Sequence, residues 1–385
     1  MSNTVCIVGL GYMGLPMAAI IANKGIKVIG YDLNEKKVES INRGECPFDE
    51  KGMPEIVKCA VEENGMIAQN SLPKANTYII SVPTPVKNRK CDLTYVTQAC
   101  EEISQICDNG SLVIIESTIR PNTCKNVVSK VFKEVNKEVL IAHCPERAIP
   151  GNTIHELTEN DRIIGGLCEK STQASYDLYK MFINGKIHLT DATTAECCKL
   201  MENTYRDVNI ALANEFAEVL EDIDVNPWEA IGLANMHPRV NILSPGPGVG
   251  GHCIAIDPWF LTEGSDKAKM ITIAREINDN RPFIIVDKVK ELATSAGDKI
   301  GILGVAYKKD VDDCRETPAT TIIKALGDSG FKVRCSDPYA INYEYELADQ
   351  AEMINWADVL VIVTDHTVYQ GLSFDKPVVD TRNIL

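Results

Sequence analysis

The sequence lacks the cysteine and histidine spacings that indicate disulfide frameworks or metal sites. Its 14 cysteines include no Cys-x-x-Cys pair, and its six histidines are scattered, with no two at the spacing of metal ligands. A chain of 385 residues is also long enough to bury a core without covalent cross-links. We therefore expect free thiols, no bound metal, and a protein of the reducing cytoplasm.

The sequence also lacks an excess of positive charge. Its 54 acidic residues outnumber its 39 Lys and Arg residues, and the net charge is -15. Nucleic acids and anionic membrane surfaces attract basic proteins, so neither is an expected partner. An anionic ligand would need a local cluster of Lys and Arg.

One uncharged stretch, Val5–Ala22, is long enough to raise the question of a membrane segment or a signal peptide. No basic residues precede it, whereas a signal peptide needs a positive N-terminal region. It also contains Gly9, Gly11, Gly14 and Pro16. We therefore interpret it as a buried strand, a turn and a buried helix.

The turn in this stretch is a Gly-x-Gly-x-x-Gly motif formed by Gly9, Gly11 and Gly14. It follows the predicted strand Thr4–Val8, and Asp32 ends the next predicted strand. This arrangement predicts a dinucleotide site with the pyrophosphate at the helix N-terminus. Asp32 can accept a hydrogen bond from a ribose 2′-hydroxyl and would repel a 2′-phosphate, which favours NAD over NADP. The alternative is a tight structural turn.

Predicted strands alternate with helices in the first half of the chain, which is typical of a parallel sheet covered on both faces. From Thr193 the pattern changes to helices without convincing strands, at Thr194–Glu221, Trp228–Ala234 and Asp266–Ala296. Pro282 is expected to kink the last of these or to start a new segment. Long helices between two α/β halves often form a dimer interface.

Strands return from Lys299 and repeat the pattern of the N-terminus. Gly25–Val28 leads to Asp32, and Gly330–Val333 leads to Asp337 at the same spacing. We therefore predict an α/β fold with two Rossmann-like parallel-sheet domains joined by a central all-helical segment. The predicted domains are residues 1–192, 193–297 and 298–385.

The turn after the first strand of the last domain lacks the third glycine and carries Lys308 and Lys309 instead. Lysines suit a phosphate that is approached by side chains rather than by bare backbone. Arg315 and Arg382 could add to this positive charge. Solvated surface charge is the alternative interpretation.

A glycine-rich run, Gly246–Trp259, is the most informative segment for chemistry. It places Cys253 behind a stretch too rich in glycine to be helix or strand, and Asp257 lies four residues further on. Such a loop can approach a ligand closely, so its thiol can reach a substrate. Cys253 is therefore a candidate nucleophile for covalent chemistry on an electrophilic carbon.

Two further sets of residues are suited to assist such a nucleophile. Lys199, Asn203 and Arg206 fall on one face of a predicted helix, and a Lys with an Asn can stabilise a developing oxyanion. Glu196 joins that face, so a surface ion pair is the alternative. Glu116–Thr118 and Pro145–Arg147 follow strands, where open α/β sheets bind ligands, although Glu116 or Glu146 could merely cap a turn.

Together these motifs resemble the UDP-glucose/GDP-mannose dehydrogenase family over nearly the whole chain. The segments that carry the resemblance are Gly9–Gly14, Glu116–Thr118, Cys144–Arg147, Lys199–Asn203, Gly250–Asp257 and Tyr307–Asp310. The resemblance implies an NAD-binding domain, a helical dimer-forming middle and a UDP-binding C-terminal domain. In having His252 before the cysteine, the chain resembles the branch that oxidises N-acetylated sugars. UDP-glucose enzymes typically have serine at this position.

The resemblance implies a four-electron oxidation of the C6 alcohol of a UDP-sugar to a carboxylate, with two NAD⁺. Cys253 would capture the aldehyde as a thiohemiacetal, and water would hydrolyse the thioester that follows. The catalytic residues implied are Cys253, Lys199, Asn203, Asp257, Glu146 and Thr118. Lys199 and Asn203 would stabilise oxyanions, and Asp257 would orient a water or Lys199.

The remaining implied roles concern hydrolysis and binding. Glu146 would act in thioester hydrolysis, and Thr118 would hold a catalytic water. The implied NAD contacts are Gly9, Gly11, Tyr12, Met13, Gly14, Asp32, Pro83, Thr84 and Thr118. The implied substrate contacts are Glu146, Arg147, Lys199, Asn203, Arg206, His237, Arg239, Gly250, Tyr307, Lys308 and Arg382. The expected partners are a UDP-sugar and a second copy of the chain through the central helices, with Arg239 reaching the substrate across that dimer.

Three alternatives stay open at this point. The configuration at C2 of the sugar is not decided by any residue. A two-electron hydroxyacid dehydrogenase with the same NAD domain would need no Cys253. A non-catalytic module that senses NAD or a sugar nucleotide would lack the Cys, Lys or Asp of the site, whereas all three are present.

Overall fold

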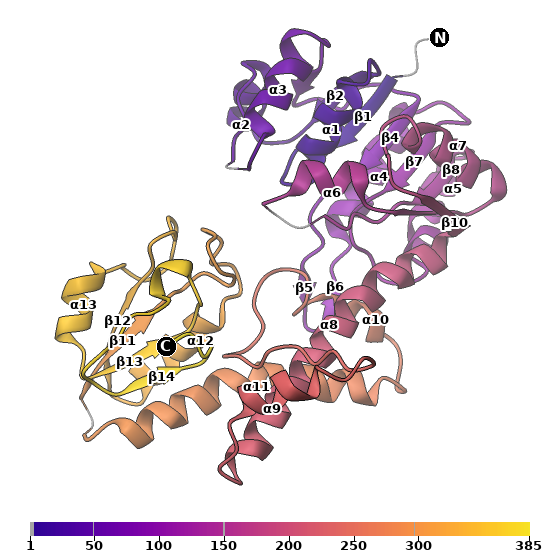
Figure 1. Ribbon diagram of the computed structural model, residues 1–385. Coiled ribbons are helices and arrows are strands. Elements are labelled where there is room, and N and C mark those ends of the chain that lie inside the picture. The colour runs from indigo at the N-terminus through magenta and orange to yellow at the C-terminus, as the bar shows by residue number, and fades with distance from the viewer. Residues whose placement is uncertain (1–3, 49, 149–150, 296) are drawn as a thin grey trace. The chain divides into compact units, whose positions relative to one another are not determined.

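The structure is a computed structural model that describes residues 4–48, 50–148, 151–295 and 297–385. The chain forms two compact units (Figure 1). The N-terminal unit consists of Met1–Met201 with Trp259–Glu263, and the C-terminal unit consists of Glu202–Pro258 with Gly264–Leu385. The three predicted domains, 1–192, 193–297 and 298–385, stay a prediction.

An eight-stranded sheet organises the N-terminal unit, in the order β10-β9-β8-β7-β4-β1-β2-β3. Its strands are β1 (Thr4–Val8), β2 (Lys27–Tyr31), β3 (Ile67–Gln69), β4 (Thr77–Ile80), β7 (Leu112–Ile115), β8 (Leu140–His143), β9 (Arg162–Gly166) and β10 (Ile187–Asp191). Neighbouring strands are parallel except β8 and β9, which pair antiparallel. The strand order reverses at β1 and β4, and open sheets bind ligands at such a reversal.

Helices cover both faces of this sheet. They are α1 (Gly14–Ala22), α2 (Glu35–Asn42), α3 (Met53–Glu62), α4 (Thr94–Ile106), the π-helix η1 (Cys124–Val128), α5 (Ser129–Glu134), α6 (Thr153–Glu159) and α7 (Glu169–Tyr179), and a hairpin of β5 (Val86–Lys87) and β6 (Lys90–Cys91) lies outside the sheet. Val5 and Ile7 of β1 join one core cluster, whereas Cys6 and Val8 join another. Side chains of a strand alternate between faces, so the uninterrupted apolar runs of these strands match a sheet buried on both sides.

The interpretation of Glu196 as part of a surface ion pair is wrong. Its side chain is fully buried, and its carboxylate accepts hydrogen bonds from the backbone N–H groups of Asn122 (2.6 Å) and Cys124 (2.8 Å). These groups lie at the start of η1 and have no carbonyl partner within that helix. A carboxylate that satisfies helix N–H groups is stabilised in burial, which the helical spacing alone did not reveal.

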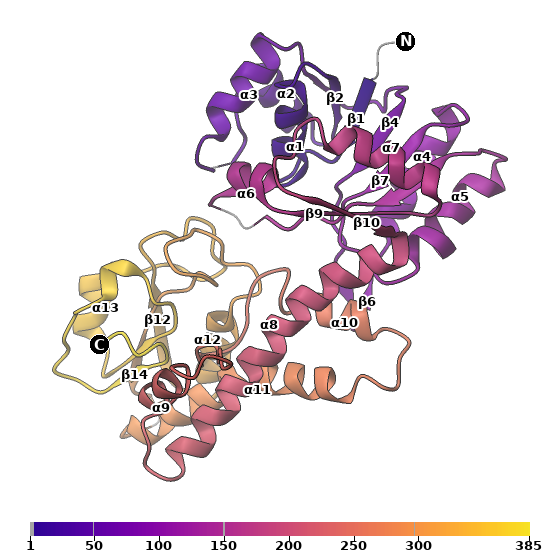
Figure 2. The ribbon, with the colours of Figure 1, turned by 45° about the vertical axis from the view of Figure 1, so that its right-hand side comes forward.

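Helices without strands follow among the described residues from Ala192 to Leu292. They are α8 (Ala192–Glu221), seen along its length in Figure 2, α9 (Pro227–Ala234), α10 (Asp257–Thr262) and α11 (Lys269–Leu292). None of the described helices is long and apolar enough to cross a membrane.

The expectation that Pro282 would start a new segment is wrong, because α11 runs through it as one helix. Proline has no N–H to donate and so weakens the helix locally. Tertiary contacts stabilise the helix just before this position. Arg281 Nε donates to the carbonyl of Gly246 (2.9 Å), and Asn278 Nδ2 donates to the carboxylate of Asp207 (2.9 Å).

A four-stranded parallel sheet organises the C-terminal unit, in the order β12-β11-β13-β14. Its elements are β11 (Lys299–Leu303), α12 (Pro318–Asp328), β12 (Lys332–Ser336), α13 (Gln350–Trp356), β13 (Val359–Ile362), the 3₁₀-helix η2 (Thr367–Tyr369) and β14 (Val378–Asp380). Here β11 lies between β12 and β13, just as β1 lies between β2 and β4. The internal repeat in the sequence is therefore a repeat of strand order.

A buried ion pair joins α8 to α11. Arg275 Nη1 lies 2.5 Å from Asp207 Oδ1, and both side chains are almost completely buried. Removing one partner leaves an uncompensated buried charge. We predict that Arg275→Met lowers the free energy of unfolding by about 3–5 kcal/mol, measured by urea denaturation.

The control is Lys288→Met, which breaks the more exposed Lys288–Glu221 pair of the same two helices. That change is expected to cost less than about 1 kcal/mol. Equal losses in the two variants would contradict the importance of the buried pair.

Candidate active site

The glycine turn after β1 has the geometry of a nucleotide cradle. Gly9 has a φ of +94°, and a Cβ there would lie 2.5 Å from the carbonyl oxygen of Ser81. A Cβ on Gly14 would lie 1.9 Å from the carbonyl oxygen of Gly9, whereas one on Gly11 would meet nothing within 4 Å. Gly9 and Gly14 are therefore required by packing, and Gly11 leaves open space where a pyrophosphate can approach the backbone.

Asp32 is held beside this turn as an ionised carboxylate. It accepts hydrogen bonds from the backbone N–H groups of Leu10 and Asn34 (2.9 Å each) and from Lys37 Nζ (2.8 Å). Burial opposes ionisation, but these hydrogen bonds, with that of Lys37 the strongest, lower the pKa of Asp32 below its usual value. A carboxylate has four lone-pair sites, so it retains capacity to accept a ribose hydroxyl. The sequence interpretation missed Lys37, which lies in the first turn of α2.

The other predicted NAD contacts lie near this turn or follow strands of the same sheet. Tyr12 packs against Phe48 with ring centroids 4.4 Å apart, while Pro83 and Thr84 follow β4, and Thr118 follows β7. Because β1, β4 and β7 are parallel neighbours, these segments leave the sheet at one edge. Ser117 Oγ accepts from the N–H of Val82 (2.8 Å) and donates to its carbonyl (2.7 Å), which ties the loops after β4 and β7 together.

Glu146 and Arg147 follow β8. Glu146 lies 3.7 Å from the buried guanidinium of Arg162 and accepts a hydrogen bond from the N–H of Ala148. Arg147 donates to the carbonyl of Asp161 (2.9 Å) and lines a cavity of about 360 Å³ together with His188. The sequence interpretation missed Arg162, whose signal would have been a lone arginine at the start of an apolar strand.

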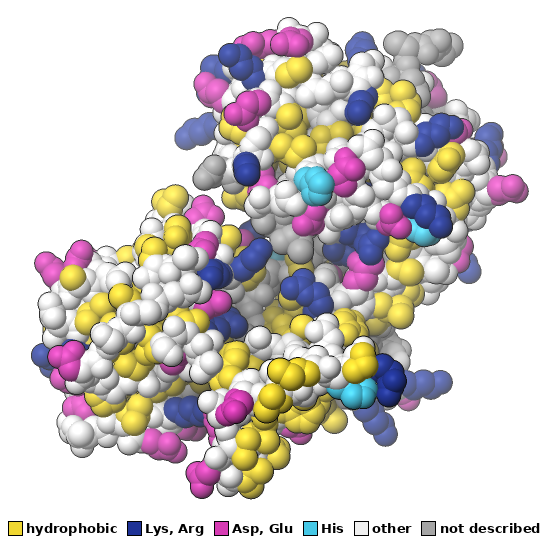
Figure 3. Space-filling view, in the orientation of Figure 1, with side chains coloured by type: hydrophobic (Ala, Val, Ile, Leu, Met, Phe, Trp, Pro, Cys, Tyr) yellow, Lys and Arg dark blue, Asp and Glu magenta, His cyan; other side chains and the backbone are white. Residues whose placement is uncertain are grey.

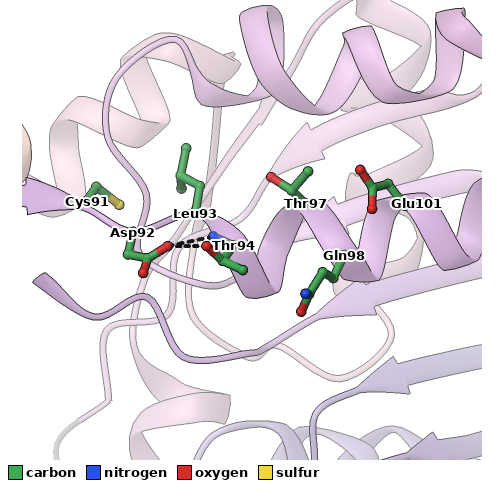
Figure 4. A pocket seen from close by; sticks show the side chains of 7 residues that line it. All are labelled: Cys91, Asp92, Leu93, Thr94, Thr97, Gln98 and Glu101. Atoms are coloured by element: carbon green, nitrogen blue, oxygen red, sulfur yellow. Dashed lines mark hydrogen bonds between the residues drawn. The ribbon is translucent and has the colours of Figure 1, made fainter. Parts of the chain in front are cut away.

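A second cavity of the N-terminal unit, of about 440 Å³, is seen from close by in Figure 4. It is lined by Cys91, Asp92, Leu93, Thr94, Thr97, Gln98 and Glu101. Asp92 accepts hydrogen bonds from the N–H (2.9 Å) and the hydroxyl (2.5 Å) of Thr94. Its ionisable side chains include Asp92 and Glu101, and none of the predicted site residues lines it, so it is poorly suited to a nucleotide phosphate.

Helix α8 carries Lys199 and Asn203 one turn apart. Asn203 Nδ2 donates a 2.6 Å hydrogen bond to Asp257 Oδ2, and both of these side chains are buried. An amide nitrogen has two N–H groups, so Asn203 keeps one for a second acceptor. The structure thus brings together two predicted residues 54 positions apart.

Cys253 lies where the glycine loop meets α10. Its carbonyl accepts hydrogen bonds from the N–H groups of Ile256 (3.1 Å) and Asp257 (2.9 Å), and the residue is exposed. The thiol is therefore carried by the first turn before a helix whose first residue, Asp257, is bound to Asn203.

The glycines of the loop are required by packing against the chain itself as well as by any ligand. A Cβ on Gly250 would lie 2.8 Å from the carbonyl oxygen of Glu316 and 2.9 Å from the Cβ of Tyr307. Gly251 has a φ of +81° and lies beside the Tyr307 ring, and a Cβ on Gly246 would lie 2.7 Å from Arg382 Nη1. The loop therefore lies closely on predicted substrate residues of the same unit.

Tyr307 is the centre of this set. Burial raises the pKa of Tyr307, Asp313 and Cys253 add to the rise, and Arg315 and Arg206 oppose it. Arg206 of α8 and Cys253 therefore lie close enough to Tyr307 to influence its ionisation.

The other predicted substrate contacts are basic side chains. Lys308, His237 and Arg239 are exposed, and His237 Nδ1 accepts the N–H of Arg239 at 3.3 Å. Arg382 Nε donates to the carbonyl of Val363 (3.2 Å). Lys308 and Arg382 belong to the C-terminal α/β part, and His237 and Arg239 follow α9.

Asp337 occupies the position that Asp32 has in the first repeat, but it has a different use. Its carboxylate is fully buried and accepts hydrogen bonds from Val305 N (2.7 Å), Ala306 N (3.0 Å) and His366 Nε2 (2.9 Å). Burial opposes ionisation, yet the hydrogen bond from His366 and those from the backbone hold the pKa of Asp337 far below its usual value. In the second repeat the acidic residue therefore stabilises the turn of its own repeat by accepting its hydrogen bonds.

The predicted residues fall into two sets by unit. The N-terminal unit holds the glycine turn, Asp32, Thr118, Glu146 and Lys199, and the C-terminal unit holds Asn203, Cys253, Asp257 and the basic substrate contacts. Within residues 4–48, 50–148, 151–295 and 297–385, no group of three or more His, Cys, Asp or Glu side chains is arranged to hold a metal ion.

Comparison with known proteins assigns the whole chain to one family. Residues 3–183 match the NAD binding domain of the UDP-glucose/GDP-mannose dehydrogenase family, residues 193–280 match its central domain, and residues 301–385 match its UDP binding domain. The protein belongs to this family of NAD-dependent nucleotide-sugar dehydrogenases.

Similar proteins span the chain from end to end. The UDP-N-acetyl-D-mannosamine dehydrogenase of Methanocaldococcus jannaschii is 48% identical over 99% of this chain and 92% of its own length. The NDP-N-acetyl-D-galactosaminuronic acid dehydrogenase of Ralstonia nicotianae is 38% identical over 99% and 96%. The solved structure of a UDP-D-ManNAc dehydrogenase from Pyrococcus horikoshii superposes with a TM-score of 0.93 at 37% identity, covering 99% of this chain and 96% of that one.

The glycine turn yields a matched pair of substitutions. A Cβ at Gly14 collides with backbone, so Gly14→Ala is expected to lower the melting temperature by several degrees. A Cβ at Gly11 meets only open space, so Gly11→Ala should leave the melting temperature unchanged and weaken NAD binding about tenfold or more, because the new methyl group takes the place of the pyrophosphate.

The two variants are compared by thermal unfolding without NAD and by NAD titration calorimetry. Unchanged NAD affinity in Gly11→Ala would show that the pyrophosphate does not approach this turn.

Proposed function

We propose that this protein oxidises the C6 alcohol of UDP-N-acetyl-D-mannosamine to a carboxylate and consumes two NAD⁺ per sugar. The observation that carries the proposal is the exposed Cys253 thiol at the head of α10, with Asp257 of the same turn bound to Asn203. The 48% identity with a UDP-N-acetyl-D-mannosamine dehydrogenase over almost the whole chain supports the choice of sugar.

The chain's own residues account for how one thiol serves two oxidations. Bound NAD⁺ supplies the hydride acceptor in each. The C6 alcohol first loses a hydride and a proton to give an aldehyde, and the Cys253 sulfur then adds to its carbonyl carbon as a thiohemiacetal. Loss of a second hydride gives a thioester, so the aldehyde never leaves the protein.

Hydrolysis completes the reaction. Water adds to the thioester carbon, the C–S bond breaks, and the Cys253 thiol and the sugar carboxylate are released. In this proposal Glu146 takes a proton from that water, and Thr118 holds it in place. The ammonium of Lys199 and the second N–H of Asn203 stabilise the oxyanions.

Asp257 fixes the amide of Asn203 through their hydrogen bond and so orients an oxyanion donor. This extends the expectation that Asp257 orients a water or Lys199. Both the Asn203 and Asp257 side chains are buried, and burial strengthens such a bond and restricts the amide to one rotamer.

The proposed binding roles follow the charge of the ligands. NAD is bound by the glycine turn together with Tyr12, Met13, Asp32, Pro83, Thr84 and Thr118. The UDP-sugar is bound by the basic and polar groups Arg147, Arg206, His237, Tyr307, Lys308 and Arg382. Gly250 allows the cysteine loop to approach the sugar closely. The net charge of the protein is -15, so these local cations must provide the attraction for the diphosphate. We place the protein in the cytoplasm, where NAD and sugar nucleotides are available.

We further propose that the protein is a homodimer that associates through α8. Five large apolar side chains of α8 and the turn after it are exposed: Tyr205, Leu212, Phe216, Val219 and Ile223. Their spacings of seven, four, three and four residues place them on one side of a helix. Figure 3 shows apolar side chains gathered over α9 and the preceding loop.

A self-complementary stripe of this kind suits the two-fold symmetry of most homodimers. In such a dimer Arg239, which follows α9 and is exposed, reaches the substrate of the partner copy. The domain boundaries that we propose remain 1–192, 193–297 and 298–385, with this stripe in the central domain.

Stoichiometry tests the reaction. UDP-N-acetyl-D-mannosamine is expected to yield two NADH per sugar, and Cys253→Ala is expected to abolish acid formation because the thioester cannot form. Cys168→Ala is the control, since Cys168 is also exposed, and should retain activity within about twofold. NADH absorbance and mass analysis of the product measure both.

The substrate panel includes UDP-N-acetyl-D-glucosamine, UDP-N-acetyl-D-galactosamine and UDP-glucose. Oxidation of UDP-glucose alone would contradict the proposed sugar, and preference for UDP-N-acetyl-D-galactosamine would follow the 38% identical relative instead. Full turnover by Cys253→Ala would overturn the covalent mechanism.

The apolar stripe predicts the effect of a charge on assembly. Leu212→Glu puts a carboxylate into the proposed interface and is expected to convert dimer to monomer in analytical ultracentrifugation. Glu55→Lys makes a charge change at an exposed residue of α3, outside the central helices, and should leave the dimer intact. A monomeric wild-type protein would contradict the proposed interface.

A further inference from the structure

A cluster of buried ionisable groups lies beneath the loop that carries Glu146. Glu116 just after β7, Arg162 at the start of β9 and Tyr179 at the end of α7 are each at most 3% exposed. The Tyr179 hydroxyl donates a 2.6 Å hydrogen bond to Glu116 Oε1. Burying charge is costly unless it is paired, so the members of this cluster depend on one another.

Arg162 is the cation whose charge acts on both carboxylates. Its Nη1 donates to the carbonyl of Pro145 (3.1 Å) and lies 3.7 Å from Glu146 Oε1. Its charge also favours ionisation of Glu116. Among the described residues, Glu116 Oε2 and Arg162 Nη2 are both buried without a hydrogen-bond partner. The Arg162 guanidinium therefore makes no bidentate hydrogen bond to either carboxylate.

We propose that Glu116 is a positioning residue for Glu146: by competing for the charge of Arg162, it decides how strongly Arg162 holds the Glu146 carboxylate. This role rests on the proposed function, in which Glu146 takes a proton from the water that hydrolyses the Cys253 thioester. When Glu116 is neutral, Arg162 attracts the Glu146 carboxylate alone and restrains it. When Glu116 is ionised, the charge of Arg162 is shared and Glu146 is freer to take up the proton from water.

The charge state of Glu116 changes near neutral pH. Burial raises its pKa to about 7, Arg162 and the Tyr179 hydrogen bond oppose the rise, and Glu146 adds to it. The groups that face Glu116 are Arg162 from β9, Tyr179 from α7, and Glu146 and Cys144 from the segment after β8. Burial raises the pKa of both the Cys144 thiol and the Tyr179 hydroxyl, so both stay neutral. Glu116 is thus the member of the cluster that titrates near neutral pH.

The first experiment is the pH profile of turnover for wild type and Glu116→Gln. The wild-type kcat is expected to rise through pH 7 as Glu116 ionises. Glu116→Gln keeps the shape and the Tyr179 contact but stays neutral, so it should match wild type at pH 6 and fall about three- to tenfold below it at pH 8, because Arg162 then restrains the general base Glu146 alone. The KM values for NAD and UDP-sugar should not change.

Intact-protein mass spectrometry locates the affected step. Because hydrolysis is slowed, Glu116→Gln should carry more of the sugar thioester on Cys253 than wild type does at pH 8. Tyr179→Phe removes a hydrogen bond that favours ionised Glu116, so the inflection in the kcat–pH profile of this variant should move to higher pH without disappearing. Glu102→Gln is the matched control, because Glu102 also accepts a tyrosine hydroxyl, from Tyr31 at 2.9 Å, and its pH profile should equal that of wild type.

A second measurement needs no substrate. The folded-state pKa of Glu116 is raised from 4.5 to about 7, so the unfolded chain loses this proton first as pH rises. The stability of wild type relative to Glu116→Gln should therefore fall between about pH 4.5 and 7 and then level off. A purely structural role would give a constant difference in melting temperature across this range.

The outcomes separate the inference from the proposed function. A wild-type protein that releases no NADH with any UDP-sugar and forms no Cys253 adduct would refute the proposed function. An active wild type whose pH profile and Cys253 adduct level are unchanged by Glu116→Gln would refute the role of Glu116 alone. Loss of the inflection with accumulation of the thioester would support it.

Discussion

The hydrogen bond between Asn203 and Asp257 is the contact on which the rest of the site depends. It ties α8 to the first residue of α10, and the N–H of Asp257 in turn donates to the carbonyl of Cys253. Through these two short contacts, the backbone that bears the thiol is fixed to the part of α8 that bears Asn203. A nucleophile on a glycine-rich loop would otherwise have large conformational freedom, and covalent catalysis needs its sulfur held near one position.

The sequence was informative wherever a site is built from neighbours in the chain. The turn from Gly9 to Gly14 and the spacing to Asp32 are local geometry, so the motif alone predicted them. The glycine-rich run likewise pointed to Cys253 and Asp257, and the family resemblance implied their roles. The surface ion pair expected of Glu196 and the new segment expected at Pro282 were wrong, because the surroundings of both residues come from distant segments. The burial of Glu196 depends on N–H groups some 70 positions away, and contacts from Gly246 and Asp207 hold α11 near Pro282.

The cluster of Glu116, Arg162 and Tyr179 shows the same limit more clearly. Each residue lies in a different element, and helical or strand periodicity carries no information about which charges will meet in a core. Burial alone would also have been a poor guide, because charged residues are seldom fully buried unless paired. Only the fold reveals that one guanidinium serves two carboxylates with different environments.

The two repeats illustrate how duplication of an architecture does not duplicate a site. Asp32 and Asp337 end equivalent strands, yet the former keeps lone pairs for a ligand and the latter gives its own to backbone N–H groups and His366.

The closely packed glycine loop has an evolutionary consequence. Gly250 faces backbone and the first side-chain atom of Tyr307, so no other residue fits there whatever stands at position 307. Within this segment we therefore expect substitutions to be tolerated at exposed positions such as His252 rather than at Gly250.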